Sequence, residues 1–348
     1  MADVAAFDNY DFPPIPTKLA DHCKAPHKTK ARITKFNLEE DCVSDQTELD
    51  QRKTYLEGRQ KENEFLAPTF RQEECLNMLK GNDYELITSE GVPVCIGSGL
   101  CGEILLAKHR STNELVAIKI YNKFVPKLTS MLKEAAIQSR ASTVLDGEVK
   151  VPKFVGFFCL KEASWHATKM AKYLFVTQFC GVIRNLPHAM TLLEAGHIPN
   201  FFTQQEWPRI CQMLITAADK MQNHDIYHLD IKLANIVLQL DGDIVTPFLI
   251  DFGLALNSCG VSQRKTVYLP RPRKEMPQHS PPELYKSNKP LPTSDIYSIA
   301  RLIEKIGKFI RCEQLMKEMK EYRKKKPKHR PGHIYLSNVV KKCFDTME

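Results

Sequence analysis

The pattern of apolar and polar positions divides the chain into a strand-rich part and a helix-rich part. Between residues 92 and 121, short apolar runs alternate with polar and glycine-rich breaks, which predicts three antiparallel strands. Apolar runs at 153–160 and 173–179 predict two more strands of the same sheet. A helix-favouring stretch at 131–137 lies between the third and fourth runs. We therefore expect a five-stranded sheet with one main helix against it.

Beyond residue 200 the apolar positions recur at helical spacing. The first stripe is formed by Ile210, Met213, Leu214, Ala217 and Met221. The second is formed by Ile296, Ile299, Ile303, Ile306 and Ile310. Thr203 and Glu206 have the spacing of a capping box ahead of the first stripe, although Pro208 leaves the first helical residue undefined. We interpret both stripes as core, and the second as the central helix of this part.

Residues 1–85 precede these patterns and differ in composition. Residues 1–45 are rich in proline and charge, which predicts a flexible tail. Residues 47–80 are highly charged with spaced leucines, which predicts one or two helices against the sheet. We therefore expect residues 1–85 to be a partly disordered N-terminal extension and residues 86–348 to be the folded domain.

The composition is that of a globular protein without a membrane segment. The 348 residues are sufficient for a sizeable core. No apolar stretch is long enough to span a bilayer, and the N-terminus lacks the pattern of a signal peptide. The eleven cysteines form no CxxC pair, which argues against zinc and indicates reduced thiols. We expect no membrane association and a cytoplasmic or nuclear location.

The residues with the clearest chemistry follow the first helical stripe. They lie in the strings HLDIKLAN and DFG. Phosphoryl transfer needs a carboxylate to orient the attacking hydroxyl, a cation to neutralise the γ-phosphate, and oxygen ligands for Mg²⁺. Asp230 fits the first role, Lys232 the second, and Asn235 with Asp251 the third.

A glycine-rich string, GSGLCG at residues 97–102, lies between two apolar runs. A GxGxxG pattern alone is a weak signal because turns are rich in glycine. Its flanks predict strand, loop and strand, whereas a dinucleotide-binding turn is followed by a helix. The string therefore suits a hairpin that covers nucleotide phosphates.

Lys119 ends the next apolar strand, in the string VAIK. An isolated surface lysine is the simpler interpretation, but the lysine stands at the spacing that a kinase requires. Glu134, in the helix-favouring stretch, is the only acidic residue near enough to pair with it from a following helix. The alternative for Glu134 is a solvated helix surface. We expect an ion pair between Lys119 and Glu134.

Together with three later motifs, these strings resemble a eukaryotic-type protein kinase domain, from about residue 92 to about residue 340. The later motifs, in the order of that family, are PPE, SDIYS and HRP. Arg330 in the last of these matches the family's arginine that pairs with the glutamate of the first, here Glu283. The resemblance implies an α+β fold with two lobes: a small antiparallel β lobe with one main helix, at about 86–180, and a larger, mainly helical lobe, at about 181–348.

The resemblance also implies an ATP-dependent protein kinase that uses Mg²⁺ and modifies a protein substrate. Lys232 favours a serine/threonine kinase over a tyrosine kinase. Gln178 and Cys180 match the segment between the lobes whose backbone binds adenine. The residues that the resemblance assigns to ATP are Ile96, Gly97, Ser98, Gly99, Gly102, Ile104, Ala117, Lys119, Glu134, Gln178 and Cys180.

Four positions depart from the family pattern. Leu229 replaces the catalytic-loop arginine, so no cation there can pair with a phosphorylated segment. Gln138 replaces an apolar residue, which predicts a weaker assembly of the active state. Met276 and His279 replace a threonine and a tyrosine before Glu283. Met276 removes one support for serine/threonine specificity.

The stretch between Asp295 and Arg330 is shorter than the family normally uses. This predicts that one helix, often a dock for substrates, is missing. A nucleotide-binding scaffold without kinase activity therefore stays as an alternative. A small-molecule kinase of related fold is a further alternative, but such enzymes generally lack a lysine at the position of Lys232.

Two basic segments complete the sequence pattern. The run at 323–330 has the composition of a nuclear localisation signal, but we favour a solvated helix end and loop. It lacks interleaved aromatic residues, so we expect no nucleic-acid binding. Residues 254–282 contain one acidic residue, Glu275, and five basic residues: Arg264, Lys265, Arg271, Arg273 and Lys274. A basic surface attracts acidic peptides, so we expect a preference for acidic protein substrates. No particular oligomeric state follows from the sequence.

Overall fold

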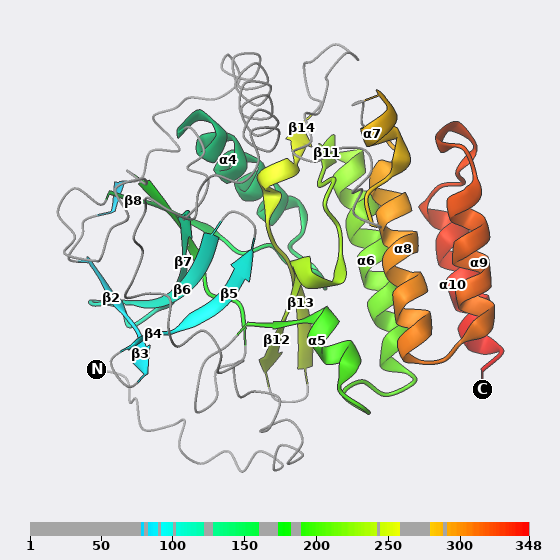
Figure 1. Ribbon diagram of the computed structural model, residues 1–348, viewed down its shortest axis with the longest axis horizontal. Helices are drawn as coiled ribbons and strands as arrows, with labels where there is room; N and C mark the ends of the chain where they lie inside the picture. The colour runs from blue at the N-terminus through cyan, green and yellow to red at the C-terminus, as the bar shows by residue number, and fades with distance from the viewer. Residues whose placement is uncertain are drawn as a thin grey trace, which may run out of the picture.

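The computed structural model describes residues 78–79, 83–89, 92–99, 102–121, 128–159, 173–181, 189–241, 244–257, 279–287 and 291–347. A strand-rich lobe lies on the left of Figure 1, and a stack of long helices lies on the right. The two-lobed α+β fold expected from the sequence is therefore confirmed. The expected flexible tail, and the helices expected at 47–80, lie outside the described residues, except for residues 78–79. Those two residues form a strand that pairs with the sheet, so the expected helix is wrong there.

The small lobe is built on a seven-stranded sheet. In spatial order its strands are β1 (Met78–Leu79), β8 (Phe154–Cys159), β9 (Tyr173–Gln178), β7 (Leu115–Tyr121), β6 (Gly102–His109) and β2 (Tyr84–Leu86), while β5 (Cys95–Gly99) also pairs with β6. The five predicted strands are present as β5 to β9. All neighbours are antiparallel except β1 and β8, which are parallel. The short strands β3 (Thr88–Ser89) and β4 (Val92–Pro93) form a separate hairpin.

Strand β7 shows how the alternating pattern divides the side chains between the two faces of the sheet. Val116 and Ile118 are buried in one apolar cluster of the small lobe. Ala117 and Lys119 alternate with them and therefore point to the opposite face. The pattern thus places the lysine of the VAIK string on the face that the main helix covers.

That helix is α4 (Leu128–Val144), which lies above the sheet in the view of Figure 1. Its residues Met131 and Ala135 are buried against Phe157 of β8 and Phe175 of β9. The two phenylalanine rings meet edge to face with centroids 5.7 Å apart. This packing holds the helix, and Glu134 on it, against the strand that carries Lys119.

The helical lobe contains six α-helices within the described residues. In chain order they are α5 (Leu192–His197), α6 (Glu206–Asn223), α7 (Pro282–Ser287), α8 (Ser294–Phe309), α9 (Glu313–Lys324) and α10 (His333–Asp345). Helix α8 packs against both α6 and α9, and α10 packs against α6 and α9. Helix α8 is therefore the central helix that the second apolar stripe predicts (Figure 1).

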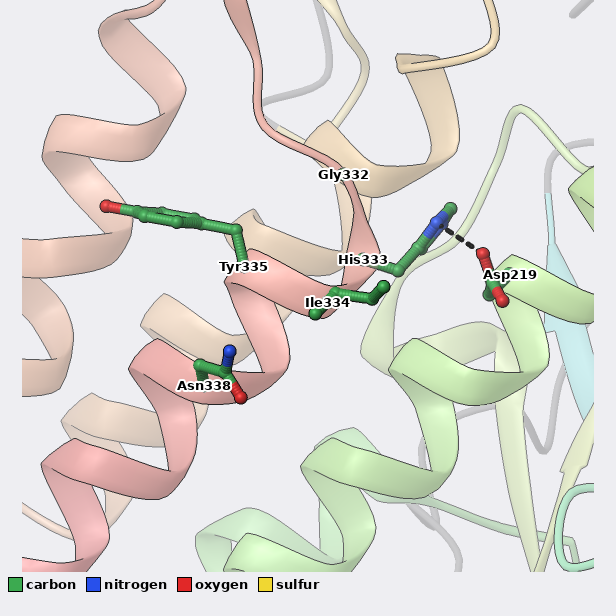
Figure 2. A pocket seen from close by; sticks show the side chains of 6 residues that line it. All are labelled: Asp219, Gly332, His333, Ile334, Tyr335 and Asn338. Atoms are coloured by element: carbon green, nitrogen blue, oxygen red, sulfur yellow. Dashed lines mark ion pairs between the residues drawn. The ribbon is translucent and has the colours of Figure 1, made fainter.

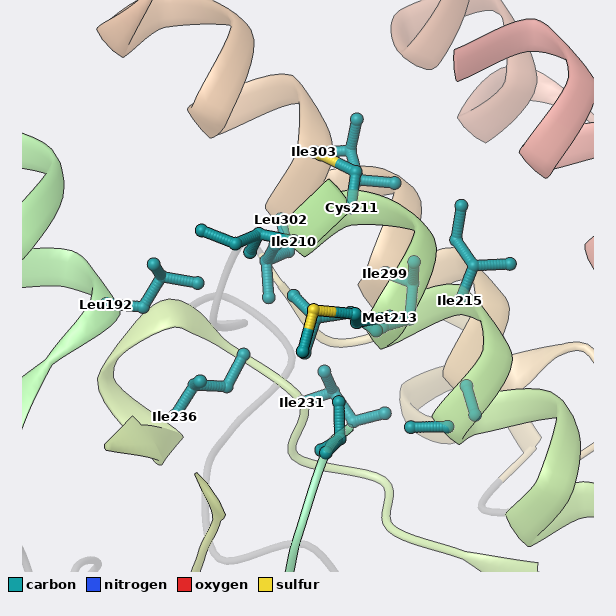
Figure 3. Close-up of a cluster of buried hydrophobic side chains, with 14 of the residues drawn as sticks. Leu192, Ile210, Cys211, Met213, Ile215, Ile231, Ile236, Ile299, Leu302 and Ile303 are labelled. Atoms are coloured by element: carbon teal, nitrogen blue, oxygen red, sulfur yellow. The ribbon is translucent and has the colours of Figure 1, made fainter. Parts of the chain in front are cut away.

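Both predicted stripes form the core of this lobe. All residues of the first stripe are buried, as are all of the second except Ile310, which is half-buried at the end of α8. Figure 3 shows side chains of α6, such as Met213, directed toward Ile299 and neighbouring residues of α8. Two isoleucines of the HLDIKLAN region belong to the same core. They are Ile231, within the string, and Ile236, directly after it.

The predicted capping box at the start of α6 is present. The amide of Thr203 donates to Oε2 of Glu206 at 2.7 Å, and the amide of Glu206 donates to Oγ1 of Thr203 at 3.3 Å. The helix itself begins at Glu206. Pro208 therefore lies in the first turn, where a missing N–H leaves no internal helix bond unmade.

Short strands bring the two strings with candidate chemistry together. The HLDIKLAN string lies between β11 (Ile226–Tyr227) and β12 (Ile236–Asp241), and the DFG string lies between β13 (Ile244–Leu249) and β14 (Leu256–Asn257). Strands β12 and β13 are antiparallel neighbours, and so are β11 and β14. The two strings therefore lie at the same end of these pairs, although they are separate in sequence.

Only one α-helix, α9, lies between α8 and Arg330. Residues 291–347 are all described, so the additional helix that the family normally has is absent from this stretch, as predicted. Among the helices described, none combines the length and apolar character needed to cross a membrane.

Candidate active site

Lys119 links the two lobes through an ion-pair network. Its Nζ lies 3.1 Å from Oε1 of Glu134 and 3.4 Å from Oδ1 of Asp251. The expected pair between the strand and α4 is therefore present, and the same lysine reaches the DFG aspartate. The charge of Lys119 is the main reason that the pKa of Asp251 lies below its usual value.

Gln138 is buried one turn after Glu134 on α4. Its Nε2 donates to the backbone carbonyl of Pro152 at 2.8 Å. A hydrogen bond thus connects α4 to the segment that enters β8, where the family normally has an apolar contact. The predicted weaker assembly of the active state stays a prediction, but the buried amide has a partner.

Asp295 on α8 anchors the start of the HLDIKLAN string through two hydrogen bonds. The amide of His228 donates to its Oδ2 at 2.7 Å, and the amide of Leu229 donates to its Oδ1 at 2.8 Å. Burial raises the pKa of Asp295, and these two hydrogen bonds oppose the rise. Leu229 has a φ of 65°, a left-handed conformation that costs a branched residue about 1–3 kcal/mol. The two hydrogen bonds from the backbone amides to Asp295 help to hold that conformation.

Asp230 lies directly after this anchored turn and is surrounded by donors. Lys232 Nζ and Asn235 Nδ2 lie 2.6 Å and 2.9 Å from its Oδ2. His279 Nε2 lies 2.7 Å from its Oδ1. Burial works against ionisation of Asp230, but the hydrogen bonds and charges of His279 and Lys232 outweigh it and lower the pKa to about 2. Asp230 is therefore a carboxylate at neutral pH.

His279 was not among the expected site residues. The sequence shows it only as a replacement for the family's tyrosine four positions before Glu283. Its contact with Asp230 joins residues 49 positions apart. No sequence spacing relates positions so far apart. The only sign in the sequence that residue 279 could belong to the site was the histidine in place of the family's tyrosine.

Leu229 and two other leucines form a buried cluster beside the catalytic string. Leu229 packs with Leu256 of β14 and Leu284 of α7, and the half-buried Tyr227 and Leu254 cover the cluster. The position where the family has an arginine is therefore apolar in its contacts as well as in its residue type. Within the described residues, this leucine cluster connects β14, which precedes residues 258–278, to α7, which follows them.

Asn235 and Asp251 provide oxygen atoms that suit Mg²⁺. The Nδ2 of Asn235 donates both to the backbone carbonyl of Asp230, at 3.0 Å, and to its carboxylate. This orientation leaves Oδ1 of Asn235 as the atom able to ligate a cation. The Asp251 side chain is an exposed carboxylate with a lowered pKa. Carboxylate and amide oxygens are ligands that Mg²⁺ prefers, so the pair fits the ion.

The glycine-rich string forms the hairpin that its flanks predicted. Gly99 lies opposite Gly102 across the β5–β6 pair, and Leu100 and Cys101 lie outside the described residues. Gly97 is in register with Ile104, which in turn is in register with Lys119 on β7. The other residues assigned to this part, Ile96, Ser98 and Ala117, lie on the same strands. The hairpin and the lysine therefore share one edge of the site.

The segment between the lobes begins at the end of β9. Gln178 lies opposite Val116 of β7, and the amide of Phe179 donates to the Leu115 carbonyl at 3.2 Å. Cys180 follows and is buried, and burial raises the pKa of its thiol to about 12. The thiol is therefore neutral and serves as a small apolar side chain at this position.

The expected pair between the PPE and HRP motifs is present in the helical lobe. Both terminal nitrogens of Arg330 contact the carboxylate of Glu283, at 2.6 Å and 2.9 Å. Ser294 Oγ also donates to Glu283. This pair fixes α7, and with it the segment that carries His279, to the body of the lobe.

A hollow of about 580 Å³ lies apart from these residues, where the start of α10 meets α6. Figure 2 shows His333 pointing from α10 toward Asp219 on α6, with Tyr335 directed away from that pair. His333 Nδ1 lies 2.8 Å from Asp219 Oδ1. No residue of the candidate site lines the hollow, so it is not part of that site.

No group of three or more His, Cys, Asp or Glu residues could hold a metal ion in the part of the chain that the structure describes. The motifs suggest a different kind of cation site, the oxygen pair of Asn235 and Asp251. A cation with so few protein ligands needs further oxygens from a bound nucleotide or water, which is usual for Mg²⁺.

Comparison with known proteins agrees with this arrangement. Residues 92–330 match the family model described as protein kinase domain. Cyclin-dependent kinase 9 of Bos taurus is 31% identical over 163 residues, which are 46% of this chain and 40% of that protein. Serine/threonine-protein kinase 10-A of Xenopus laevis is 26% identical over 180 residues, 51% of this chain and 16% of that protein. Sperm motility kinase 2B of Mus musculus is 27% identical over 159 residues, 46% of this chain and 28% of that protein. The match spans less than half the length of each relative.

Proposed function

This chain belongs to the protein kinase family, and from that premise we propose that it transfers the γ-phosphoryl group of ATP to a serine or threonine hydroxyl of a protein substrate. The observation that carries the proposal is the convergence of Asp230, Lys232 and Asn235, whose side chains meet within 2.9 Å of one carboxylate oxygen. The amino-acid preference rests on Lys232 alone, because Met276 stands where serine/threonine kinases have a threonine and so gives no second support.

Each residue has a role that follows from its contacts. Asp230 accepts a hydrogen bond from the substrate hydroxyl and takes its proton, because its pKa of about 2 keeps it ionised. The hydroxyl oxygen bonds to phosphorus as the bond from phosphorus to ADP breaks. Lys232, which lies 2.6 Å from Asp230, neutralises charge on the transferred group.

Nucleotide binding is assigned to the edge of the small lobe. The β5–β6 hairpin covers the phosphates, and Lys119, held by Glu134 at 3.1 Å, donates to them. Asn235 and Asp251 would hold Mg²⁺, and the bound ion would supply positive charge near the phosphate oxygens. The backbone of Gln178 and Cys180 faces the adenine. The kinase domain in this proposal comprises residues 86–348, with a lobe boundary at about residue 180, together with the preceding residues of β1 and β2 that pair with its sheet.

A nucleotide-binding scaffold without catalytic activity is the second candidate. The missing helix between α8 and α9 favours it, because the family often uses that helix to dock substrates. The intact set of Asp230, Lys119 and Asp251 argues against it. A small-molecule kinase is less well supported, because such enzymes generally lack a lysine at the position of Lys232, which here lies 2.6 Å from Asp230.

The test is a transfer assay with radiolabelled ATP and generic protein substrates. We expect wild-type protein to label at least one substrate. Asp230→Asn and Lys119→Met should each lower turnover about 100-fold or more, because general-base and electrostatic contributions are each that large. Asp146→Asn, which changes an exposed carboxylate, is the matched control and should be neutral.

Substrate labelling, measured together with nucleotide affinity, separates the two main candidates. A scaffold binds ATP, measured by calorimetry, but labels no substrate. If Asp230→Asn retained wild-type turnover, the assignment of the base would be wrong. Phosphoamino-acid analysis of the product then tests the expected serine or threonine acceptor against tyrosine.

A further inference from the structure

The two oxygens of Asp230 have different partners. Oδ2 receives hydrogen bonds from Lys232 and Asn235, which belong to the same loop as Asp230. Oδ1 receives its bond from His279, which lies four residues before Glu283 in the segment that enters α7. The His279 contact is therefore the one that joins the candidate base to a separate part of the chain.

The contact is sheltered from water. The side chains of His279 and Asp230 are 16% and 13% exposed, and their atoms approach to 2.7 Å. Because Oδ1 of a carboxylate can only accept, Nε2 of His279 must carry the hydrogen. A carboxylate oxygen has two lone pairs, so one hydrogen bond from His279 leaves Oδ1 able to accept a second one.

Helix α8 holds both partners of this contact. Asp295 accepts the amides of His228 and Leu229, immediately before Asp230. Ser298 Oγ donates to the backbone carbonyl of His279 at 2.9 Å. Positions 295 and 298 lie three apart, on the same face of the helix. One rigid element thus sets where the base and the histidine stand relative to each other.

We propose that His279 is a positioning residue for Asp230: it fixes the rotation of the carboxylate so that Oδ1 stays available to the acceptor hydroxyl on the side of the peptide-binding segment. This role rests on the proposed function. In its absence the carboxylate is held only through Oδ2 and turns about its Cβ–Cγ bond. The family's threonine in this segment is replaced here by Met276, which has no hydrogen to donate to a carboxylate.

The first test compares three variants in steady-state kinetics. His279→Phe keeps a ring but removes the donor, and we expect kcat to fall roughly 10- to 100-fold, as misplaced catalytic groups do, with KM for ATP within about threefold of wild type. His279→Gln restores an N–H donor and should recover most of that loss. His329→Phe changes an exposed histidine and is the matched control. Thermal stability of each variant is measured in parallel.

A lower kcat with a nearly unchanged KM and an unchanged melting temperature supports the view that His279 positions Asp230. A merely structural role would lower the melting temperature instead. A rise of kcat in His279→Phe would overturn the proposal, since it would mean that the histidine blocks the base. An unchanged kcat would overturn it as well.

The second test does not depend on turnover. With isotope-labelled histidine, long-range proton–nitrogen NMR identifies which ring nitrogen of His279 carries hydrogen, and His279→Gln assigns the signal. We expect Nε2 to be protonated in the wild type and to lose that preference in Asp230→Asn. An unprotonated Nε2 in the wild type, or no response to Asp230→Asn, would overturn the proposal even in an active enzyme. A wild type that shows the signal but no turnover would refute the proposed function, and the positioning role with it, while leaving the contact in place.

Discussion

The buried ion pair of Glu283 and Arg330 allows a quantitative prediction about the stability of the helical lobe. The two side chains are 5% and 1% exposed, and two parallel hydrogen bonds join them. The guanidinium carbon also lies 4.6 Å from the centre of the Tyr297 ring. Removal of one charge from such a pair leaves the other buried without compensation.

Glu283→Gln removes the negative charge with little change in size. Breaking a buried pair in this way costs about 3–5 kcal/mol. Among the residues that the structure describes, Arg330 would keep neutral acceptors such as the Thr293 carbonyl at 3.3 Å. We therefore expect the free energy of unfolding to fall by about 3–5 kcal/mol. Glu283→Gln combined with Arg330→Met should recover part of this loss, because the double variant buries no unpaired charge.

The chain supplies its own control. Arg209 and Glu148 are also paired, at 3.3 Å, but are 68% and 61% exposed. An exposed pair contributes about 0–1 kcal/mol, so Glu148→Gln should change the free energy of unfolding by no more than that. The comparison isolates burial, since both variants change a paired glutamate to glutamine.

Urea unfolding followed by tryptophan fluorescence measures these differences. Trp207 is buried in the core of the helical lobe, and Trp165 is the second of the two tryptophans. In a Trp165→Phe background the signal reports on the lobe that contains the pair. If Glu283→Gln destabilised the lobe no more than Glu148→Gln does, the reasoning from burial would be refuted.

Three further predictions concern activity. Phosphatase treatment should leave turnover within about threefold, because Leu229 offers no cation to a phosphate; a loss that rephosphorylation restores would contradict this. Peptides with Asp and Glu around the acceptor should be preferred, and charge reversal at Arg271, Arg273 and Lys274 should invert the ranking in a positional library at low salt. Alkylation of Cys101 should block nucleotide binding, and ATP should protect it; equal labelling with and without ATP, measured by mass spectrometry, would contradict the placement of this loop over the phosphates.

Local patterns predicted most of the fold. Strands β5 to β9 and the stripes of α6 and α8 follow from periodicity, because each element buries one face and its sequence records which one. The ion pair of Lys119 and Glu134 followed from the same patterns, since only one acidic residue lay on the next helix. The pair of Glu283 and Arg330 was found only through the resemblance to the kinase family.

Two features depended on tertiary contacts that periodicity does not record. Strand β1 has two residues, too few for an alternating pattern, and its parallel pairing with β8 is visible only in the folded sheet. Tyr84 of β2 is buried among residues of β7 and β9, although its own segment is highly polar. The start of the sheet was therefore placed too late by composition alone.

The departures from the family pattern become coherent when their contacts are considered together. Where an arginine would need a phosphate, Leu229 packs with Leu256 and Leu284, so apolar contacts connect the two ends of residues 258–278. His279, which stands where the family has a tyrosine, contacts the candidate base Asp230 at 2.7 Å. The buried leucine cluster and the hydrogen bond from His279 both form between unmodified side chains. Neither contact requires a phosphate group. We therefore expect these contacts to join the HLDIKLAN loop to its neighbouring segment without phosphorylation.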